Sequence, residues 1–141
     1  MTIVTHFYSD PHWGHKNIIG FCDRPFRTVA HMESELVARY NAAVSPYDTV
    51  CWVGDCFFTS PGQASHLLGL LNGRKILVRG NHDKSPQRMV ELGFDLVTDL
   101  LWLPIVGVPC RVIHYPPNGA TQNTHRERAD KYTSRRPPND G

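Results

Sequence analysis

Four short apolar runs in this chain each end in a cluster of glycine, aspartate, asparagine or histidine. The runs are rich in β-branched and aromatic residues, which is typical of buried strands. They cover residues 3–8, 49–53, 75–78 and 110–112, and the clusters that close them are residues 9–12, 54–55, 80–83 and 113–115. Where several such strands run parallel, their carboxyl ends meet at one edge of a sheet, the usual place for ligands in α/β proteins. The pattern therefore predicts that polar side chains from distant parts of the chain meet at one point.

Helices are predicted between these strands from apolar spacing and capping residues. The predicted helices are residues 29–44 after the N-cap Thr28, a helix after Ser60 that ends at residues 72–73, and a helix after Ser85 that stops at Gly93. A shorter helical segment is expected to end at Gly20. Further short strands, with antiparallel pairing as one arrangement, are expected over residues 96–97, 100–103 and 105–108. Strands alternating with helices predict an α/β domain.

Length and composition narrow the class of protein. At 141 residues and 40% hydrophobic content the chain fits one globular domain. A net charge of +2 is too small to argue for nucleic acid through bulk electrostatics, and no window is apolar enough for a membrane span. The four cysteines form no CxxC pair, and Cys51 and Cys110 lie in apolar runs typical of buried thiols, which favours a reducing, cytoplasmic setting. Residues 1–116 are expected to form the domain, whereas residues 117–141 lack Leu, Ile, Val, Phe and Met and are expected to form a polar loop or mobile tail.

The clusters supply a mixed set of oxygen and nitrogen donors, namely Asp10, His12, Asp55, Asn81 and His114. A set without thiolates suits Mn, Fe, Zn, Co or Ni better than Ca or a cysteine-type structural zinc. One carboxylate can bridge two metal ions about 3.5–4 Å apart, the separation used in phosphoester hydrolysis. Asp55 is the expected bridge, because it lies between the two candidate ligand sets in chain order.

These motifs resemble those of the calcineurin-like metallophosphoesterase superfamily, closest to its small single-domain bacterial and phage members. The signature of that superfamily runs Asp-x-His, Gly-Asp, Gly-Asn-His-Asp or Glu, a lone His, then Gly-His-x-His. Residues 10–12, 54–55, 80–83 and His114 match the first four blocks. The resemblance implies a two-sheet β core flanked by helices and a dinuclear centre of two divalent ions, with manganese as the first choice.

The resemblance also implies a role for each matching residue. The implied ligands are Asp10, His12 and Asp55 for one metal, and Asp55, Asn81 and His114 for the other. His82 would lie near the leaving oxygen, as a general acid or as a positive clamp on the phosphate. Asp83 would orient His82. The implied activity is hydrolysis of a phosphomonoester or phosphodiester by a bridging hydroxide.

The last block of the signature is missing, since no Gly-His-x-His follows His114 and the later His125 does not match. Residues 117–141 are accordingly expected to begin a truncated C-terminal part, with one or more strands missing and a homodimer contact over the exposed sheet. One alternative is a catalytically weak or inactive domain that binds metal or phosphate. A second alternative is a nuclease, with nucleic acid as the substrate.

Several other residues have two open interpretations each. His15 either contacts phosphate or caps a helix start, and Arg24 and Arg79 either contact phosphate or are surface charges. Trp13 is expected to line the mouth of the cleft rather than to stack on a base. Cys56, directly after Asp55, is expected to be a packing residue.

Overall fold

The computed structural model of this protein describes residues 3–115. The predicted tail over 117–141, including His125, lies outside the described residues. Four parallel strands form the main sheet in the order β1-β2-β3-β4. Their bounds are His6–Ser9 for β1, Thr49–Val53 for β2, Arg74–Val78 for β3 and Leu96–Thr98 for β4. The predicted α/β class is confirmed, although β4 runs parallel to its neighbour rather than antiparallel.

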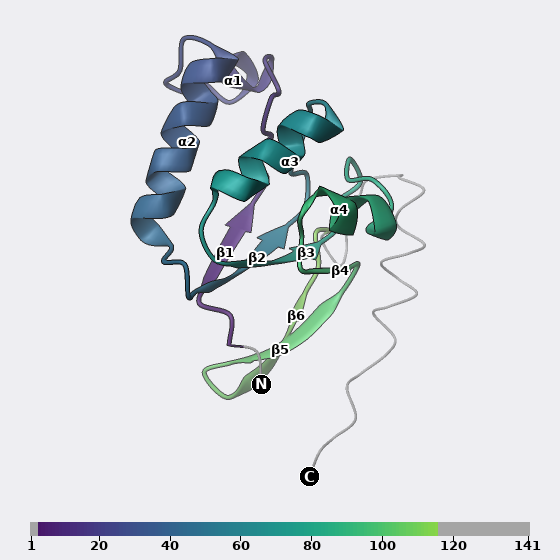
Figure 1. Ribbon diagram of the computed structural model, residues 1–141. Helices are drawn as coiled ribbons and strands as arrows, with labels where there is room; N and C mark the ends of the chain where they lie inside the picture. The colour runs from purple at the N-terminus through teal and green to yellow at the C-terminus, as the bar shows by residue number, and fades with distance from the viewer. Residues whose placement is uncertain (1–2, 116–141) are drawn as a thin grey trace.

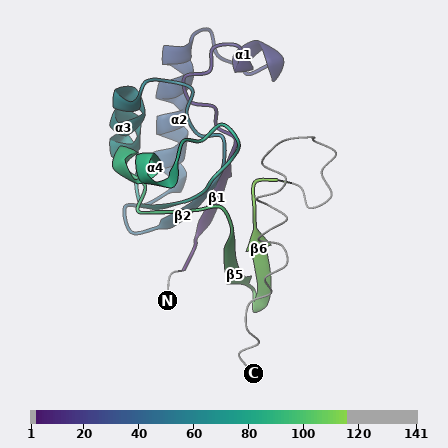
Figure 2. The ribbon, with the colours of Figure 1, turned by 90° about the vertical axis from the view of Figure 1, so that its right-hand side faces the viewer.

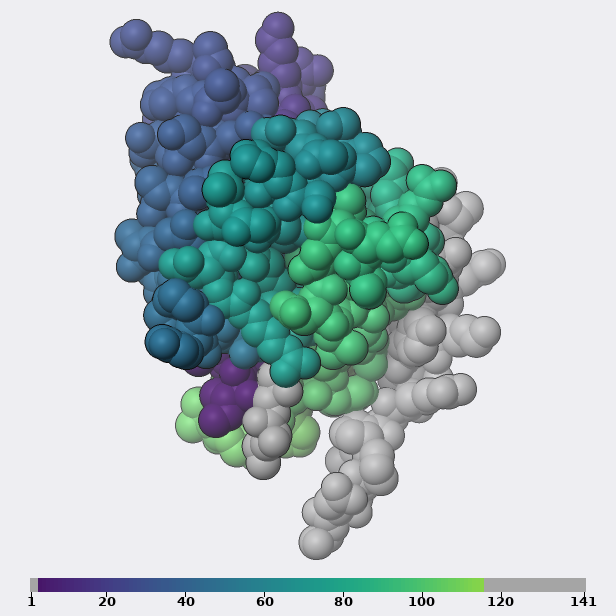
Figure 3. Space-filling model, viewed as in Figure 1, coloured from purple at the N-terminus to yellow at the C-terminus, as the bar shows by residue number. Residues whose placement is uncertain are grey.

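Three helices cover one face of this sheet (Figure 1). They are α2 (Val29–Ala43), α3 (Pro61–Leu70) and α4 (Pro86–Leu92). Parallel strands are joined by right-handed crossovers, so strands that follow each other across the sheet send their helices to the same side. The helices pack together and hide much of the sheet from that side (Figure 3). Within residues 3–115, no helix is both long and apolar enough to cross a membrane.

A two-stranded antiparallel hairpin lies on the opposite side of the main sheet (Figure 2). Its strands are β5 (Leu101–Ile105) and β6 (Val108–Val112). The single strand predicted over residues 105–108 is wrong, because residues 106–107 form the turn that joins β5 to β6. Val106 and Gly107 have φ values of 50° and 75°, and two consecutive positive φ angles make the tight turn that matches the twist of a hairpin.

The predicted N-caps are confirmed, since the hydroxyls of Thr28, Ser60 and Ser85 each accept a hydrogen bond from a backbone N–H of the first helical turn. The prediction that the first helical segment ends at Gly20 is wrong, because α1 spans Ile18–Phe21. Helical hydrogen bonds from Phe21 N–H to Asn17 and from the next amide to Ile18 continue past the glycine. Glycine weakens a helix without ending it where such bonds persist.

The core lies between the main sheet and the helices, with Trp52 at its centre. The ring of Trp52 lies 4.8 Å from that of Tyr8 and 5.3 Å from that of Phe94, in edge-to-face contacts. Trp13 also belongs to this core and is completely buried, so the expectation that it lines a cleft mouth is wrong. Trp13 N–H donates to Cys56 O, and Trp13 O accepts from Phe58 N–H, so the segment after β1 lies directly against the segment after β2.

Cys56 is completely buried, which confirms it as a packing residue. Burial raises the pKa of its thiol well above the usual value, and the nearby carboxylate of Asp83 adds to this effect. The thiol is therefore held in its neutral form.

Candidate metal centre

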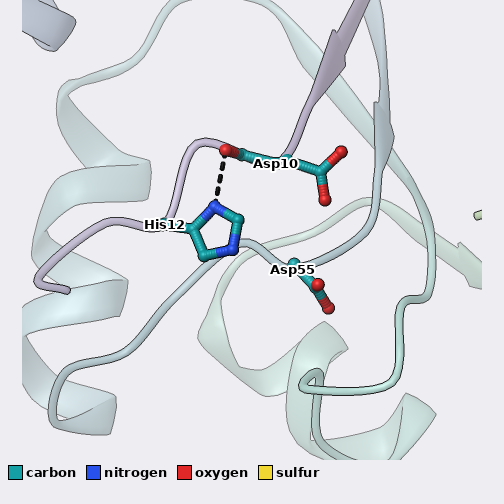
Figure 4. Close-up of side chains that lie close together, drawn as sticks. All are labelled: Asp10, His12 and Asp55. Atoms are coloured by element: carbon teal, nitrogen blue, oxygen red, sulfur yellow. Dashed lines mark hydrogen bonds between the residues drawn. The ribbon is translucent and has the colours of Figure 1, made fainter. Parts of the chain in front are cut away.

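The segments that follow β1 and β2 lie side by side at the carboxyl ends of the strands. Asp10 N–H donates to Gly54 O at 3.2 Å, and His12 N–H donates to Asp55 O at 3.3 Å. These bonds continue the parallel β1–β2 pairing beyond the strands and bring three side chains together. One ligand atom from each of Asp10, His12 and Asp55 lies within 4.8 Å of the others (Figure 4).

All three of these residues have left-handed backbone conformations. The φ angles are 49° at Asp10, 54° at His12 and 52° at Asp55. Non-glycine residues adopt such angles rarely and at a cost of about 1–2 kcal/mol each, so strained residues of this kind cluster at functional sites. Among the residues described, only Asp23 and Val106 are other non-glycine residues with positive φ.

Hydrogen bonds fix the ring of His12 in one tautomer. Its Nδ1 lies 2.7 Å from Asp10 O, an acceptor, so Nδ1 carries the proton and donates (Figure 4). Nε2 is then the nitrogen with a free lone pair, which is the arrangement expected of a metal-binding histidine. The ring also stacks on Phe58, with centroids 5.1 Å apart and planes 11° apart.

Arg24 stabilises the backbone of the segment after β1 through hydrogen bonds to its carbonyl groups. Its guanidinium donates to Pro11 O at 2.7 Å and to Asp10 O at 3.2 Å. His15, the other nearby basic residue, accepts the N–H of Ile18 through Nδ1 at 3.1 Å. This bond is the one that the capping interpretation of His15 predicts, and a contact of His15 with phosphate stays a prediction.

Asp55 is the most buried of the candidate ligands, with 6% of its surface exposed. Its Oδ2 lies 3.2 Å from His82 Nδ1 and 3.4 Å from His114 Nε2, and its Oδ1 accepts the His82 N–H at 3.1 Å. Burial alone would raise the pKa of Asp55, but the bonds from His114 and His82 outweigh burial and hold this pKa well below its usual range. Asp55 is therefore a carboxylate at neutral pH.

His114 reaches the centre from the opposite side of the sheet, after the end of β6. Its Nδ1 lies 3.1 Å from Val53 O and 3.9 Å from Asp10 Oδ1. The ring rests directly on Gly54, where a Cβ would overlap it. Burial would lower the pKa of His114, but its bonds to Asp55 and Val53 raise this pKa from 6.5 to about 9.

The turn after β3 completes the surroundings of Asp55. Asp83 accepts backbone N–H groups of Asp55, Cys56 and Gly80 at 3.0, 3.0 and 2.7 Å. Its carboxylate thus joins the two turns, and it positions Asp55 rather than the ring of His82. A Cβ on Gly80 would lie 2.5 Å from Asp55 Oδ1, so only glycine permits this approach.

The remaining predicted site residues of this turn have different surroundings. Asn81 is half-buried between Gly80 and His82, both of which contact Asp55. Arg79 makes a two-pronged ion pair with Asp99, at 2.7 and 3.0 Å. The guanidinium of Arg79 is therefore paired with a carboxylate, and it also stabilises the turn after β3 through a hydrogen bond to Lys84 O.

The sequence analysis missed Phe58, which lies against three histidines. Its ring centroid is 5.1 Å from that of His12, 4.6 Å from that of His15 and 5.2 Å from that of His82. Its position three residues after Asp55, next to another phenylalanine, offers no pattern that separates it from a core residue. Phe58 lies against these histidines because the segment after β2 pairs with the segment after β1.

The arrangement fits divalent metal ions by donor type and placement. Asp10, His12 and Asp55 bring one ligand atom each within 4.8 Å of one another, and His12 has Nε2 free. His114 adds a second imidazole, whose Nε2 lies 3.4 Å from Asp55 Oδ2. Such mixed oxygen and nitrogen sets suit Mn, Fe, Co, Ni and Zn. In the metal-free form, His114 offsets part of the negative charge that a metal would otherwise balance.

Metal binding is expected to release about one proton per chain near pH 8, because His114 must lose its proton to become a ligand. With a pKa raised from 6.5 to about 9, the ion pair with Asp55 stabilises the metal-free fold below pH 6.5, and this contribution is lost as the pH rises through about 9. Manganese affinity should accordingly rise with pH, by about tenfold per unit, up to that value. Calorimetric titration in two buffers with different heats of ionisation measures the released proton. Equal heats in both buffers, or release that persists in His114→Gln, would contradict this expectation.

Comparisons with known proteins give relatives without an assigned activity. No family model matches the chain. The uncharacterized protein MJ1445 of Methanocaldococcus jannaschii is 32% identical over 120 residues, which are 84% of this chain and 62% of that protein. This chain thus spans less than two thirds of that relative's length. The crystal structure of AQ665 from Aquifex aeolicus, a protein of unknown function, matches with a TM-score of 0.71 and 26% identity, over 94% of this chain and 72% of that one. The chain is therefore similar in sequence to a protein of an archaeon and similar in fold to a protein of a bacterium.

Proposed function

We propose that this chain is a metal-dependent phosphoesterase with a dinuclear centre, of the kind found in the calcineurin-like metallophosphoesterase superfamily. The observation that carries the proposal is the meeting of Asp10, His12 and Asp55 within 4.8 Å, each with a strained left-handed backbone. Asp and His adopt left-handed backbone more often than most residues, so the convergence of the three side chains supports the proposal more strongly than the strain does. The main sheet, its helices and the separate hairpin are compatible with the two-sheet core of that superfamily.

Asp55 would be shared between the two ions. Asp10 and His12, with His12 Nε2 available, would hold the first ion together with Asp55. His114, 3.4 Å from the same carboxylate, would hold the second ion together with Asn81 and Asp55. Manganese is the first choice, with iron, zinc, nickel and cobalt as alternatives.

Two such ions would supply positive charge for the phosphoryl oxygens and would acidify a water molecule near neutral pH. The residues of the chain supply the remaining functions. His82 has 52% of its side chain exposed, and Asp55 engages its Nδ1, so Nε2 is left to donate to the departing oxygen of a substrate. Asp83 and Arg24 hold the backbone on either side of the centre, which keeps the ligands in place without contact to substrate.

Manganese-dependent hydrolysis of bis-p-nitrophenyl phosphate tests the proposal. His82→Ala is expected to lower kcat by about 10²- to 10⁴-fold, the usual contribution of a positioned proton donor. The matched control is His66→Ala, an exposed histidine on α3, which should leave turnover unchanged. Absence of manganese-dependent turnover, or equal turnover in both variants, would favour a domain that binds metal or phosphate without catalysis.

A further inference from the structure

A row of aromatic side chains leads outward from the candidate metal centre. This row, called here the aromatic strip, consists of Phe58, His12, His15 and Phe21. Phe58 stacks on His12, the ring of His15 lies 4.6 Å from that of Phe58, and the ring of Phe21 lies 6.4 Å from that of His15. Phe21 ends the strip and is 77% exposed, so most of its ring is accessible to a ligand.

Phe21 also lines a groove beyond the strip, between α1 and the start of α2. Figure 1 shows these two elements next to each other beyond the carboxyl ends of the strands. The groove has a volume of about 830 Å³, within the range of pockets that hold a small organic ligand or a segment of one. Lys16 and Arg27 line the same groove.

The two cations of the groove are available to a ligand. Lys16 and Arg27 are exposed, and within residues 3–115 no ion pair involves either of them. Asp23 is the only acidic residue between them in the sequence, and it does not line the groove. Arg24, by contrast, is occupied by backbone carbonyls and contributes no free donor of this kind. The groove therefore combines an exposed flat ring with two free positive charges.

We propose that this groove binds single-stranded nucleic acid, with a base stacked on Phe21 and a phosphate next to the scissile one held by Lys16 and Arg27. Stacking platforms beside cationic groups are the common way to hold single strands, because every base has a flat face and every linkage a negative charge. A duplex hides those faces in its own stack. Because Lys16 and Arg27 line the groove at the far end of the strip, the phosphate that they hold would be a different one from the phosphate at the metal centre, and a strand of nucleotides supplies both. The inference rests on the proposed function, because it names the substrate class of the same centre.

A hydrolysis-resistant probe separates binding from turnover. The probe is a single-stranded phosphorothioate tetranucleotide with one 2-aminopurine, whose fluorescence falls on stacking. Its comparator has the same linkages without bases, and the affinity of the comparator is measured by its displacement of the probe. Wild-type protein with manganese is expected to bind the tetranucleotide about tenfold more tightly than the comparator. Phe21→Ala should abolish this ratio, whereas Phe21→Trp should restore it. Tyr47→Ala, a change at a 97% exposed ring in the connection between α2 and β2, is the matched control and should have no effect.

The contribution of Lys16 and Arg27 is measured separately, through the salt dependence of binding. Lys16→Gln and Arg27→Gln should each weaken both probes equally and reduce the slope of log affinity against log salt by about 0.7. Arg88→Gln, an exposed residue on α4, should leave the slope unchanged. Equal affinity for the two probes, equal binding of duplex and single strand, or equal effects of Phe21→Ala and Tyr47→Ala would overturn the inference. Turnover of bis-p-nitrophenyl phosphate without Phe21-dependent binding would overturn this inference alone, and Phe21-dependent binding without turnover would overturn the proposed function alone.

Discussion

Replacing Asp55 with asparagine is expected to raise the dissociation constant for manganese by about 100-fold or more at both sites. Loss of a residue that only supports a ligand costs 10–100-fold, and Asp55 is the carboxylate assigned to both ions. The amide keeps the shape of the side chain and an oxygen that can accept the His82 N–H, now at 3.1 Å from Oδ1, so the change removes mainly the charge. Equilibrium dialysis with metal analysis measures the effect.

Glu91→Gln is the matched control for this change, since it removes an exposed carboxylate from α4. Its manganese binding should equal that of the wild type. If Asp55→Asn lowered affinity no more than Glu91→Gln, the assignment of Asp55 as the shared ligand would be wrong. If only one of two ions were lost, Asp55 would belong to a single site.

Replacing Gly54 with alanine is expected to destabilise the fold and to displace His114. At φ = 74° a non-glycine residue costs about 1–2 kcal/mol, and the added Cβ would overlap the His114 ring, which adds about 1–3 kcal/mol of overpacking. The sum is a loss of about 2–5 kcal/mol in the free energy of unfolding. Urea denaturation of the metal-free protein measures the loss, and a metal titration should show that one of the two ions is bound more weakly.

Gly107→Ala separates the two causes. Gly107 has nearly the same backbone, with φ = 75°, but a Cβ there would meet open space at the tip of the hairpin. It should lose only about 1–2 kcal/mol and should bind metal normally. Equal losses in the two variants would mean that the contact between Gly54 and His114 contributes nothing.

The convergence of the first candidate ligands could be predicted from the sequence, because local signals determine where these residues lie. Asp10, His12 and Asp55 directly follow apolar runs that become β1 and β2, and parallel strands bring such ends together. His114 was predicted by the same argument, yet it follows β6, an antiparallel strand outside the main sheet. It reaches Asp55 because the hairpin lies on the other face of that sheet and Gly54 leaves room for its ring.

The partners of the supporting residues could not be predicted, because long-range contacts select them. Nothing near Arg79 in the sequence indicates that Asp99, 20 residues later, would hold its guanidinium. Asp83 adjoins His82 in sequence but binds backbone amides of the turn after β2, 27 and 28 residues earlier. Trp13 and Phe58 are both aromatic residues near a candidate ligand in the sequence. Only the pairing of the two loops decides that the first is buried in the core and the second lies against the histidines.

The number of manganese ions bound per chain is the most direct test of a dinuclear centre. The wild-type protein, stripped of metal and dialysed against manganese at pH 8, is expected to retain two ions per chain, and electron paramagnetic resonance should show that they are magnetically coupled through a shared ligand. Asp55→Asn in the same experiment should retain neither ion at a manganese concentration that just saturates the wild type. Retention of no ion by the wild type, or of a single ion that survives Asp55→Asn, would contradict the proposed centre.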